Sequence, residues 1–250
     1  MSYISDFKGA PFSLFGSTGG VTPTAASDAS PTTLAGARFS SADGREFVLV
    51  LNGAVALTAG KLVQAPASVG ANHTGLACAT AAIGATSITV TLGGTAATAN
   101  QYAGGYAVVS AGTGIGQTLR INSHPAQTST SGTLVLTLED PLSVATAVSD
   151  SKVSLTLNQH KDVVISPTTA TGASVGVTLY PIPAASYGFL VKRGPVAVLN
   201  DSATAIGLDV MPSSSVAGAV VTYVVATRNR IGTSTVAGEN TKAQLINVQL

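Results

Sequence analysis

The chain has 250 residues, of which 45% are hydrophobic and only 9% carry a charge, and its formal net charge is +1. Soluble domains usually contain about 25% charged residues, so the surface of this protein must be covered largely by small polar and apolar side chains. The near-zero net charge gives no indication of binding to nucleic acid, an anionic membrane or an acidic substrate. The single cysteine, Cys78, excludes an internal disulfide and a zinc site built from several cysteines.

Residues 1–42 form a region of distinct composition. The stretch GSTGGVTPTAASDASPTTLAG is of low complexity and is expected to be mobile on its own. Four apolar side chains nevertheless precede it: Phe7, Phe12, Leu14 and Phe15. A plain linker has no use for them, so we predict an extended arm whose apolar anchors dock either on a partner or on this chain's own core. No secretory signal is expected, because charged residues and a proline interrupt the first 16 residues.

From residue 43 onward the pattern predicts β-strands separated by turns. Apolar residues alternate with Thr and Ser in 86–92, 134–138 and 153–157, as in half-buried strands. The pair Asn52-Gly53 between two apolar runs predicts a type I′ hairpin turn. With 27 glycines and 11 prolines breaking the chain into short segments, we predict an all-β fold of short-stranded sandwich or small β-barrel units.

Two β domains are expected after the arm. A change of rhythm in NQHKDV suggests a boundary near residue 160. We therefore predict a β domain over 43–162 and a small β-barrel-like domain over 163–250. The apolar run 217–226 is about half as long as a membrane-spanning helix, and it predicts a buried strand.

Three glycines in SAGTGIGQT raise the question of a phosphate-binding loop. A dinucleotide fingerprint needs a helix directly after the loop. Here QTLRI follows, and it alternates Leu119 and Ile121 as a strand does. We therefore interpret Gly112, Gly114 and Gly116 as a tight turn between two strands, with positive φ where the turn requires it.

No group of residues predicts catalysis or metal binding. His160 and Asp162 would share one face of a strand, but two ligands fall short of the three or four that zinc needs. The adjacent Glu139 and Asp140 would point to opposite faces of a strand and fit a turn better than an acid–base pair. We expect no catalytic residue, no metal, no cofactor and no enzymatic activity.

Arg228 and Arg230 provide a concentration of positive charge. Their two-residue spacing places them on one face of a strand. They are candidates to pair with acidic groups of a partner, and solvated loop ends are an equally good interpretation.

Several phrases, in their order along the chain, resemble structural proteins from the head-gene clusters of tailed bacteriophages. They include DGREFVLVLNGAVALTAGKLVQAP, LVLTLEDPL and VVISPTTATGASVGVTLYPIPAASYGFLVKRGPVAVL, and the resemblance spans residues 43–250. The C-terminal part is similar in style to small β-barrel capsid decoration proteins. The resemblance implies a non-enzymatic virion protein, made in the host cytoplasm, that binds the capsid exterior as a homo-oligomer, with a trimer favoured.

In that role the chain would bind the major capsid protein and cement neighbouring capsomers, with no nucleic acid and no membrane as partner. Phe7, Phe12, Leu14 and Phe15 would be the arm anchors, and Arg228 and Arg230 would be weaker contacts. The main alternative is a head fibre or tail adhesin that binds a host surface. The absence of Trp argues mildly against an adhesin, and a carbohydrate-active β protein ranks last.

Overall fold

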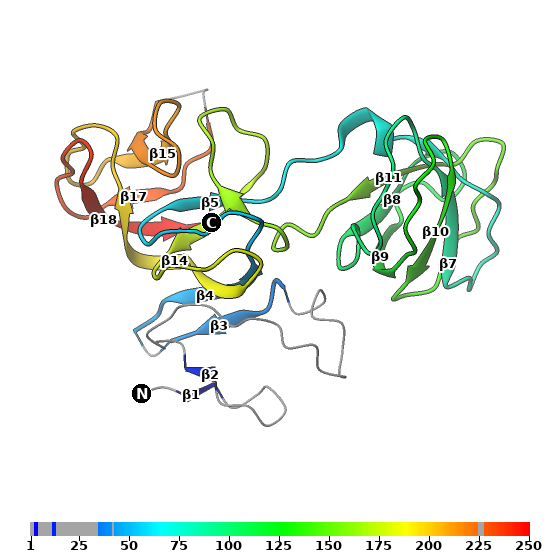
Figure 1. The fold of residues 1–250 in the computed structure, drawn as a ribbon, viewed down its shortest axis with the longest axis horizontal. Helices are drawn as coiled ribbons and strands as arrows, with labels where there is room; N and C mark the ends of the chain where they lie inside the picture. Colours follow the sequence, from blue (N-terminus) through cyan, green and yellow to red (C-terminus); the bar gives the residue numbers. More distant parts are fainter. Residues whose placement is uncertain (1–2, 5–11, 14–34, 42, 225–227) are drawn as a thin grey trace. The chain divides into compact units, whose positions relative to one another are not determined.

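The computed structural model describes residues 3–4, 12–13, 35–41, 43–224 and 228–250. The protein is nearly all β, with 2% of residues in helices and 43% in strands, and its main sheets form a half barrel and a nearly closed barrel (Figure 1). This confirms the expected fold class. In the described part of the chain, no helix is both long enough and apolar enough to cross a membrane.

The chain divides into two compact units. The first unit consists of Met1–Pro66 and Gln159–Leu250, and the second unit consists of Ala67–Asn158. The expected boundary near residue 160 coincides with the end of the second unit. The expected assignment of 43–162 to one domain differs from this division, because residues 43–66 belong to the first unit and the second unit is an insertion between its strands.

The second unit is an antiparallel six-stranded barrel, in the strand order β6-β11-β8-β9-β10-β7. Its strands are β6 (Leu76–Ala77), β7 (Ser87–Thr91), β8 (Tyr106–Ala111), β9 (Thr118–Ser123), β10 (Thr133–Leu138) and β11 (Lys152–Thr156), and a 3-10 helix η2 (Gly70–His73) precedes them. A bridge between Cys78 and Val90 joins the two ends of the strand order, and the Ala79 amide donates to the Thr89 carbonyl at 2.9 Å. The sheet therefore returns to its own first strand.

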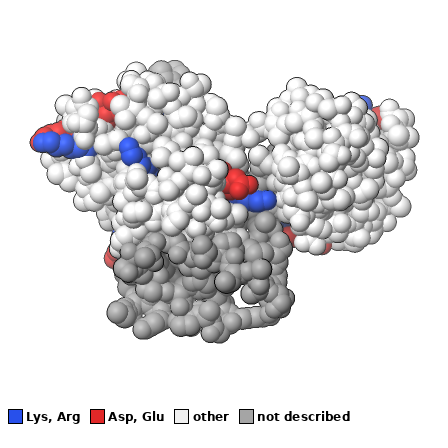
Figure 2. Space-filling view, viewed as in Figure 1, with Lys and Arg blue, Asp and Glu red and all other residues white. Residues whose placement is uncertain are grey.

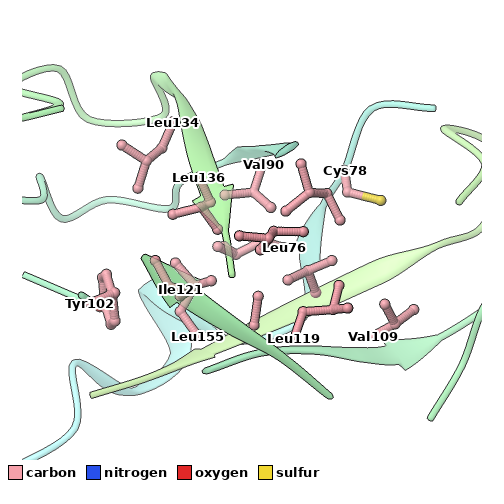
Figure 3. Close-up of a cluster of buried hydrophobic side chains, with 14 of the residues drawn as sticks. Leu76, Cys78, Val90, Tyr102, Val109, Leu119, Ile121, Leu134, Leu136 and Leu155 are labelled. Atoms are coloured by element: carbon pink, nitrogen blue, oxygen red, sulfur yellow. The ribbon is translucent and has the colours of Figure 1, made fainter. Parts of the chain in front are cut away.

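Apolar side chains, which alternate with polar ones along the strands, fill the interior of this barrel. In β10 the burial pattern alternates without exception, with Leu134, Leu136 and Leu138 buried. Side chains from all six strands meet in one core, which Figure 3 shows, and Cys78 is one of its members. The expected strands at 86–92, 134–138 and 153–157 are confirmed as β7, β10 and β11.

The first unit holds a ten-stranded sheet. Its strands are β3 (Arg38–Ser40), β4 (Glu46–Leu51), β5 (Leu62–Gln64), β12 (Val164–Ile165), β13 (Ser174–Thr178), β14 (Tyr187–Leu199), β15 (Asp209–Pro212), β16 (Val220–Thr222), β17 (Gly232–Ser234) and β18 (Ala243–Gln249). The long β14 pairs with β4, β13 and β18. Neighbouring residues of β4 point to opposite faces, so that Phe47 enters one buried cluster while Val48 and Val50 enter another.

The end of the segment expected as an arm belongs to this sheet. Residues 38–40 pair with β4, and the ring of Phe39 lies edge-on to Phe189 at a centroid distance of 5.3 Å. The other two strands of the N-terminal region, β1 (Tyr3–Ile4) and β2 (Phe12–Ser13), pair with each other.

A repeated pairing of loops occurs in both units. In each pair, two residues from distant loops exchange reciprocal backbone hydrogen bonds, and each residue lies five to nine positions before the next strand begins. Four such pairs occur among the described residues: Leu57 with Ile182, Ala81 with Thr146, Ala97 with Gln127, and Thr204 with Gly238. Six of these eight residues have a residue with positive φ three positions later: Gly60, Gly84, Asn100, Ala185, Gly207 and Thr241. The loops are thereby fixed to each other as well as to their own strands.

One local expectation is wrong, and a second is confirmed only in part. Asn52 and Gly53 form no hairpin turn, because neither has positive φ and Asn52 instead bridges to Val163. The buried Asn52 amide donates to three backbone carbonyls, which holds the chain in a loop rather than a tight reversal. The run 217–226 contributes only the short strand β16 among its described residues.

Candidate interaction surface

The loops of the second unit gather at two ends of its barrel. Because neighbouring strands alternate in direction, residues 78–86, 112–117 and 139–151 lie at one end, which we call the tip. Residues 67–75, 92–105 and 124–132 lie at the other end, which we call the base. The chain enters the unit at Ala67 and leaves it at Asn158, both at the base. The tip is therefore the end away from the chain connections.

The tip exposes four large apolar side chains. Their exposed fractions are 69% for Ile83, 66% for Ile115, 46% for Val144 and 69% for Val148. One comes from each of the first two loops and two from the third. Single exposed apolar residues are normal on a protein surface, whereas a group on neighbouring loops indicates a contact site.

One glutamine holds two of these loops together. The Gln117 amide nitrogen donates to the carbonyls of Gly114 at 3.1 Å and Val144 at 2.9 Å. Its amide oxygen accepts from the backbone N–H groups of Ser143 and Val144, each at 3.0 Å, and from the Ser143 hydroxyl at 3.1 Å. Gln117 thus fixes the backbone that carries Val144 beside the hairpin that carries Ile115.

Further side chains join the third loop to the other two. Asp150 accepts from both the backbone N–H and the hydroxyl of Thr113, at 3.1 and 3.0 Å. The Thr146 hydroxyl donates to the Ala79 carbonyl at 3.1 Å, and the Val148 amide donates to the Thr80 hydroxyl at 3.1 Å. The apolar side chains therefore stand on loops that are already ordered, which lowers the entropy lost when a partner binds.

Close approach of two backbones explains one glycine of the tip. Gly112, Gly114 and Gly116 all have positive φ in the hairpin between β8 and β9, so the turn interpretation is confirmed. A Cβ on Gly112 would lie 2.3 Å from the Asp150 carbonyl oxygen, whereas one on Gly116 would meet nothing within 4 Å. Gly112 is thus required by the packing of the hairpin on the 139–151 loop.

The few charges of the second unit lie at or near the tip. The second unit contains five charged residues, which are Arg120, Glu139, Asp140, Asp150 and Lys152. Arg120 and Glu139 form an ion pair at 3.2 Å. The face of this unit drawn in Figure 2 is almost entirely uncharged. The tip therefore presents its apolar side chains beside three carboxylates, of which Glu139 is paired with Arg120 and Asp150 accepts from Thr113.

Replacing Gln117 by Leu is expected to loosen the tip without unfolding the barrel. The change removes five hydrogen bonds, and at about 0.5–1.5 kcal/mol each, with partial replacement by water, it should cost about 2 kcal/mol of local stability. Hydrogen exchange of the amides of residues 143–145 should accelerate about thirty-fold. Gln101→Leu at the base is the matched control, since Gln101 caps only its own turn through Thr98, and it should leave these amides unchanged. Unaltered exchange in Gln117→Leu would show that the glutamine does not order the tip.

None of the residues expected from the sequence to bind a partner belongs to the three tip segments. Phe7, Leu14 and Phe15 are outside the described residues, and Phe12 lies in β2. Arg228 donates to the Ser213 carbonyl at 2.8 Å and to the Thr168 carbonyl.

Arg230 is also engaged within the first unit. It pairs with Asp209 at 3.0 Å and donates to Thr233 at 2.8 Å. Neither arginine lies in a strand, so the expected shared strand face is wrong: the described residues on either side of 225–227 form a loop between β16 and β17.

In a basic cluster of the first unit, burial and neighbouring positive charges lower the pKa of two side chains. Burial lowers the pKa of His160 to about 4, and the charges of Lys192 and Arg38 act in the same direction. Burial and then Arg38 lower the pKa of Lys192, against the opposite effect of Glu46. His160 is therefore neutral at pH 7.

His160 and Asp162 do not share a strand face as expected. Both lie in a turn, in which Asp162 has a φ of 56°. Within the ranges that the structure describes, no group of three or more His, Cys, Asp or Glu side chains is placed to hold a metal ion.

Comparison of the chain with protein-family models, with curated proteins and with solved structures finds no match. The resemblance to phage head proteins therefore stays a prediction. Sequence reasoning did not find the tip, because its four apolar residues come from three separate loops. The available signal was the isolated apolar residue in each turn, such as Ile83 in AAIGAT and Ile115 in GTGIGQ.

Proposed function

We propose that this chain is a non-enzymatic structural protein of a virus particle, which binds the outside of a tailed-phage head and cements neighbouring capsomers. The observation that carries the proposal is the tip: four exposed apolar side chains on loops that Gln117, Thr146 and Asp150 hold in place. Such a preordered apolar surface favours a protein contact over a flexible or highly charged ligand.

The choice of a phage head as the partner rests on the resemblance of residues 43–250 to head structural proteins. The low charge supports it, because a surface with 9% charged residues loses little solvation of ions when it is packed into an assembly. The partner is then the major capsid protein. The chain would act as a homo-oligomer, with a trimer expected at positions of three-fold or quasi-three-fold symmetry.

Cementing would follow from repeated modest contacts. Each buried Å² of apolar surface contributes about 25 cal/mol. An arm anchored through Phe7, Phe12, Leu14 and Phe15 would add a second contact to that of the tip. Once the arm or the tip is bound to the capsid, the other is held near its own site at a raised effective concentration. Many copies on one head would then resist separation of capsomers.

The proposal is tested by adding the purified chain to heads that lack it and measuring co-sedimentation. Saturable binding at a fixed ratio to the major capsid protein, together with greater resistance of the heads to heating, is the expected result. Binding to host cells with none to heads would instead indicate an adhesin. Binding to neither would overturn the proposal.

Deleting residues 2–16 should weaken binding to heads without unfolding either unit. The arm anchors are removed, and the avidity between arm and tip is lost, which typically amounts to about 10²-fold. Co-sedimentation titrations of the full and shortened chains measure the change. Unchanged binding by the shortened chain would refute the role of the arm while leaving that of the tip intact.

A further inference from the structure

Asn52 and Gly53 form the one Asn-Gly pair of the sequence. In such a pair the asparagine side chain reacts readily with the backbone, because glycine has no Cβ to hinder the approach of its nitrogen to the asparagine Cγ. The structure nevertheless places this pair at a buried position. Asn52 directly follows β4, is 1% exposed and bridges to Val163. The chemistry of a reactive sequence at a buried position depends on whether the chain is folded.

The fold recognises the amide nitrogen of the Asn52 side chain. Nδ2 donates to the carbonyls of Val55, Ile182 and Pro183, at 2.9, 3.1 and 2.9 Å. A carbonyl oxygen can only accept, so the group that faces these three oxygens must be a donor. The amide oxygen, by contrast, is buried and has no hydrogen-bond partner among the described residues. The side chain is therefore held through its nitrogen, which is the atom that deamidation removes.

The backbone of the pair is also held. The Asn52 N–H donates to the Ser186 carbonyl at 2.9 Å, and the Gly53 N–H donates to the Val163 carbonyl at 3.0 Å. Before the Gly53 nitrogen can attack Asn52 Cγ, it must give up its bond to Val163, and the side chain must leave its three carbonyls. In the folded chain the reaction is therefore blocked until this loop opens.

We propose that Asn52 is a deamidation site that the fold keeps closed, and that its reaction after the first unit unfolds yields a chain that cannot refold. In the open chain the Gly53 backbone nitrogen attacks Asn52 Cγ and forms a C–N bond. The Cγ–Nδ2 bond breaks, and ammonia leaves with the proton of the Gly53 nitrogen. Water then opens the resulting succinimide at either carbonyl. The product is aspartate, or isoaspartate, in which the side-chain carbons have become part of the main chain.

Neither product fits the site. Aspartate would place a carboxylate, which has no donor, against the carbonyl oxygens of residues 55, 182 and 183 in the protein interior. Isoaspartate would lengthen the main chain by one atom between the backbone bonds to Ser186 and Val163, so that both bonds could not form together. The amide of Asn52 joins the loop after β4 to the loop before β14. Its loss therefore separates segments that are distant in sequence.

The test compares the folded chain with the chain unfolded in urea, both at the same mildly alkaline pH and temperature. Peptide mapping by mass spectrometry should show that Asn52 deamidates about 100-fold or more slowly in the folded chain. The reason is that opening breaks three side-chain hydrogen bonds, each worth roughly five-fold in the opening equilibrium.

Refolding is then measured on the unfolded samples after the urea is removed. The fraction that regains hydrogen-exchange protection in β4 and β14 should fall in step with deamidation at Asn52. A sample kept unfolded for the same time at mildly acidic pH is the control. There the Gly53 nitrogen loses its proton much less readily, so the reaction is slow and the chain should refold fully.

Two variants separate the chemistry from the time spent unfolded. Asn52→Asp carries the product from synthesis, and it should lack protected β4 and β14 amides under conditions in which the wild-type chain is folded. Asn240→Asp is the matched control, since Asn240 is exposed in a loop of the first unit, and it should fold as the wild type does. Equal rates of deamidation in the folded and unfolded chains would overturn the proposal. Full refolding of chains deamidated at Asn52, or native protection in Asn52→Asp, would do the same.

Discussion

Replacing Ile83 and Val148 together with aspartate is expected to lower the affinity for phage heads by at least 100-fold. Both side chains are 69% exposed and come from the two loops joined by the pairing of Ala81 with Thr146. Burying one such side chain is worth about 1.5–3 kcal/mol, and each aspartate would also have to be desolvated at the contact. A loss of about 3 kcal/mol corresponds to roughly 100-fold in affinity.

The measurement is a co-sedimentation titration with heads that lack the chain. Because both side chains face solvent, the double variant should unfold at the same temperature as the wild type. Ile206→Asp in the first unit is the matched control, since Ile206 is 66% exposed in a turn of the same kind. If the double variant binds as the wild type does, or if the control loses as much affinity, the tip is not the contact.

Replacing Gly112 by Ala should lower the free energy of unfolding of the second unit by about 3 kcal/mol or more. The added Cβ would lie 2.3 Å from the Asp150 carbonyl oxygen, where both partners are backbone and cannot turn away, and φ is 74°. The left-handed conformation alone costs a residue with a side chain about 1–2 kcal/mol, and the overlap adds a cost typical of overpacking, about 1–3 kcal/mol.

Gly116→Ala separates these two contributions. Gly116 has a φ of 92° in the same hairpin, yet an added Cβ would meet nothing within 4 Å. Gly116→Ala should therefore lower the free energy of unfolding by only about 1–2 kcal/mol, through backbone strain. Urea unfolding, followed through exchange of the β8 and β11 amides, measures both variants. Equal losses would show that the hairpin does not pack closely on the 139–151 loop.

The local strand pattern was predictable because it depends on neighbouring residues. The alternation of Leu134, Leu136 and Leu138 fixes which face of β10 is buried. The hairpin after β8 was predictable for the same reason, since its glycines and the alternation after them lie within one short window. In both cases the physical cause is local in sequence.

The features that organise the units were not predictable in this way. Leu57 pairs with Ile182 across 125 residues, and no local pattern in either loop names its partner. Asn52-Gly53 has the composition of a tight turn, but burial of the Asn52 amide against carbonyls of residues 182 and 183 overrides that preference. The insertion of the second unit between strands of the first likewise depends on pairing between distant segments.

The tip could not be predicted, because its local composition is misleading and the side chains that hold its loops are distant in sequence. The composition of PLSVATAVSD, at 141–150, is compatible with a short helix, although Thr and Val weaken helices. In the structure the side chains of Gln117, Thr113 and Thr80 bind this segment as a loop. Val144 and Val148, which would be core residues of an amphipathic helix, are exposed instead.

The ratio of this chain to the major capsid protein in purified particles of the virus that encodes it tests the cement proposal most directly. Quantitative mass spectrometry gives the ratio without any assumption about the contact. A cement that covers the lattice should be present at roughly one-third to one copy per capsid protein, as the repeated symmetry of the assembly requires. A few copies per particle, or none, would contradict the proposal.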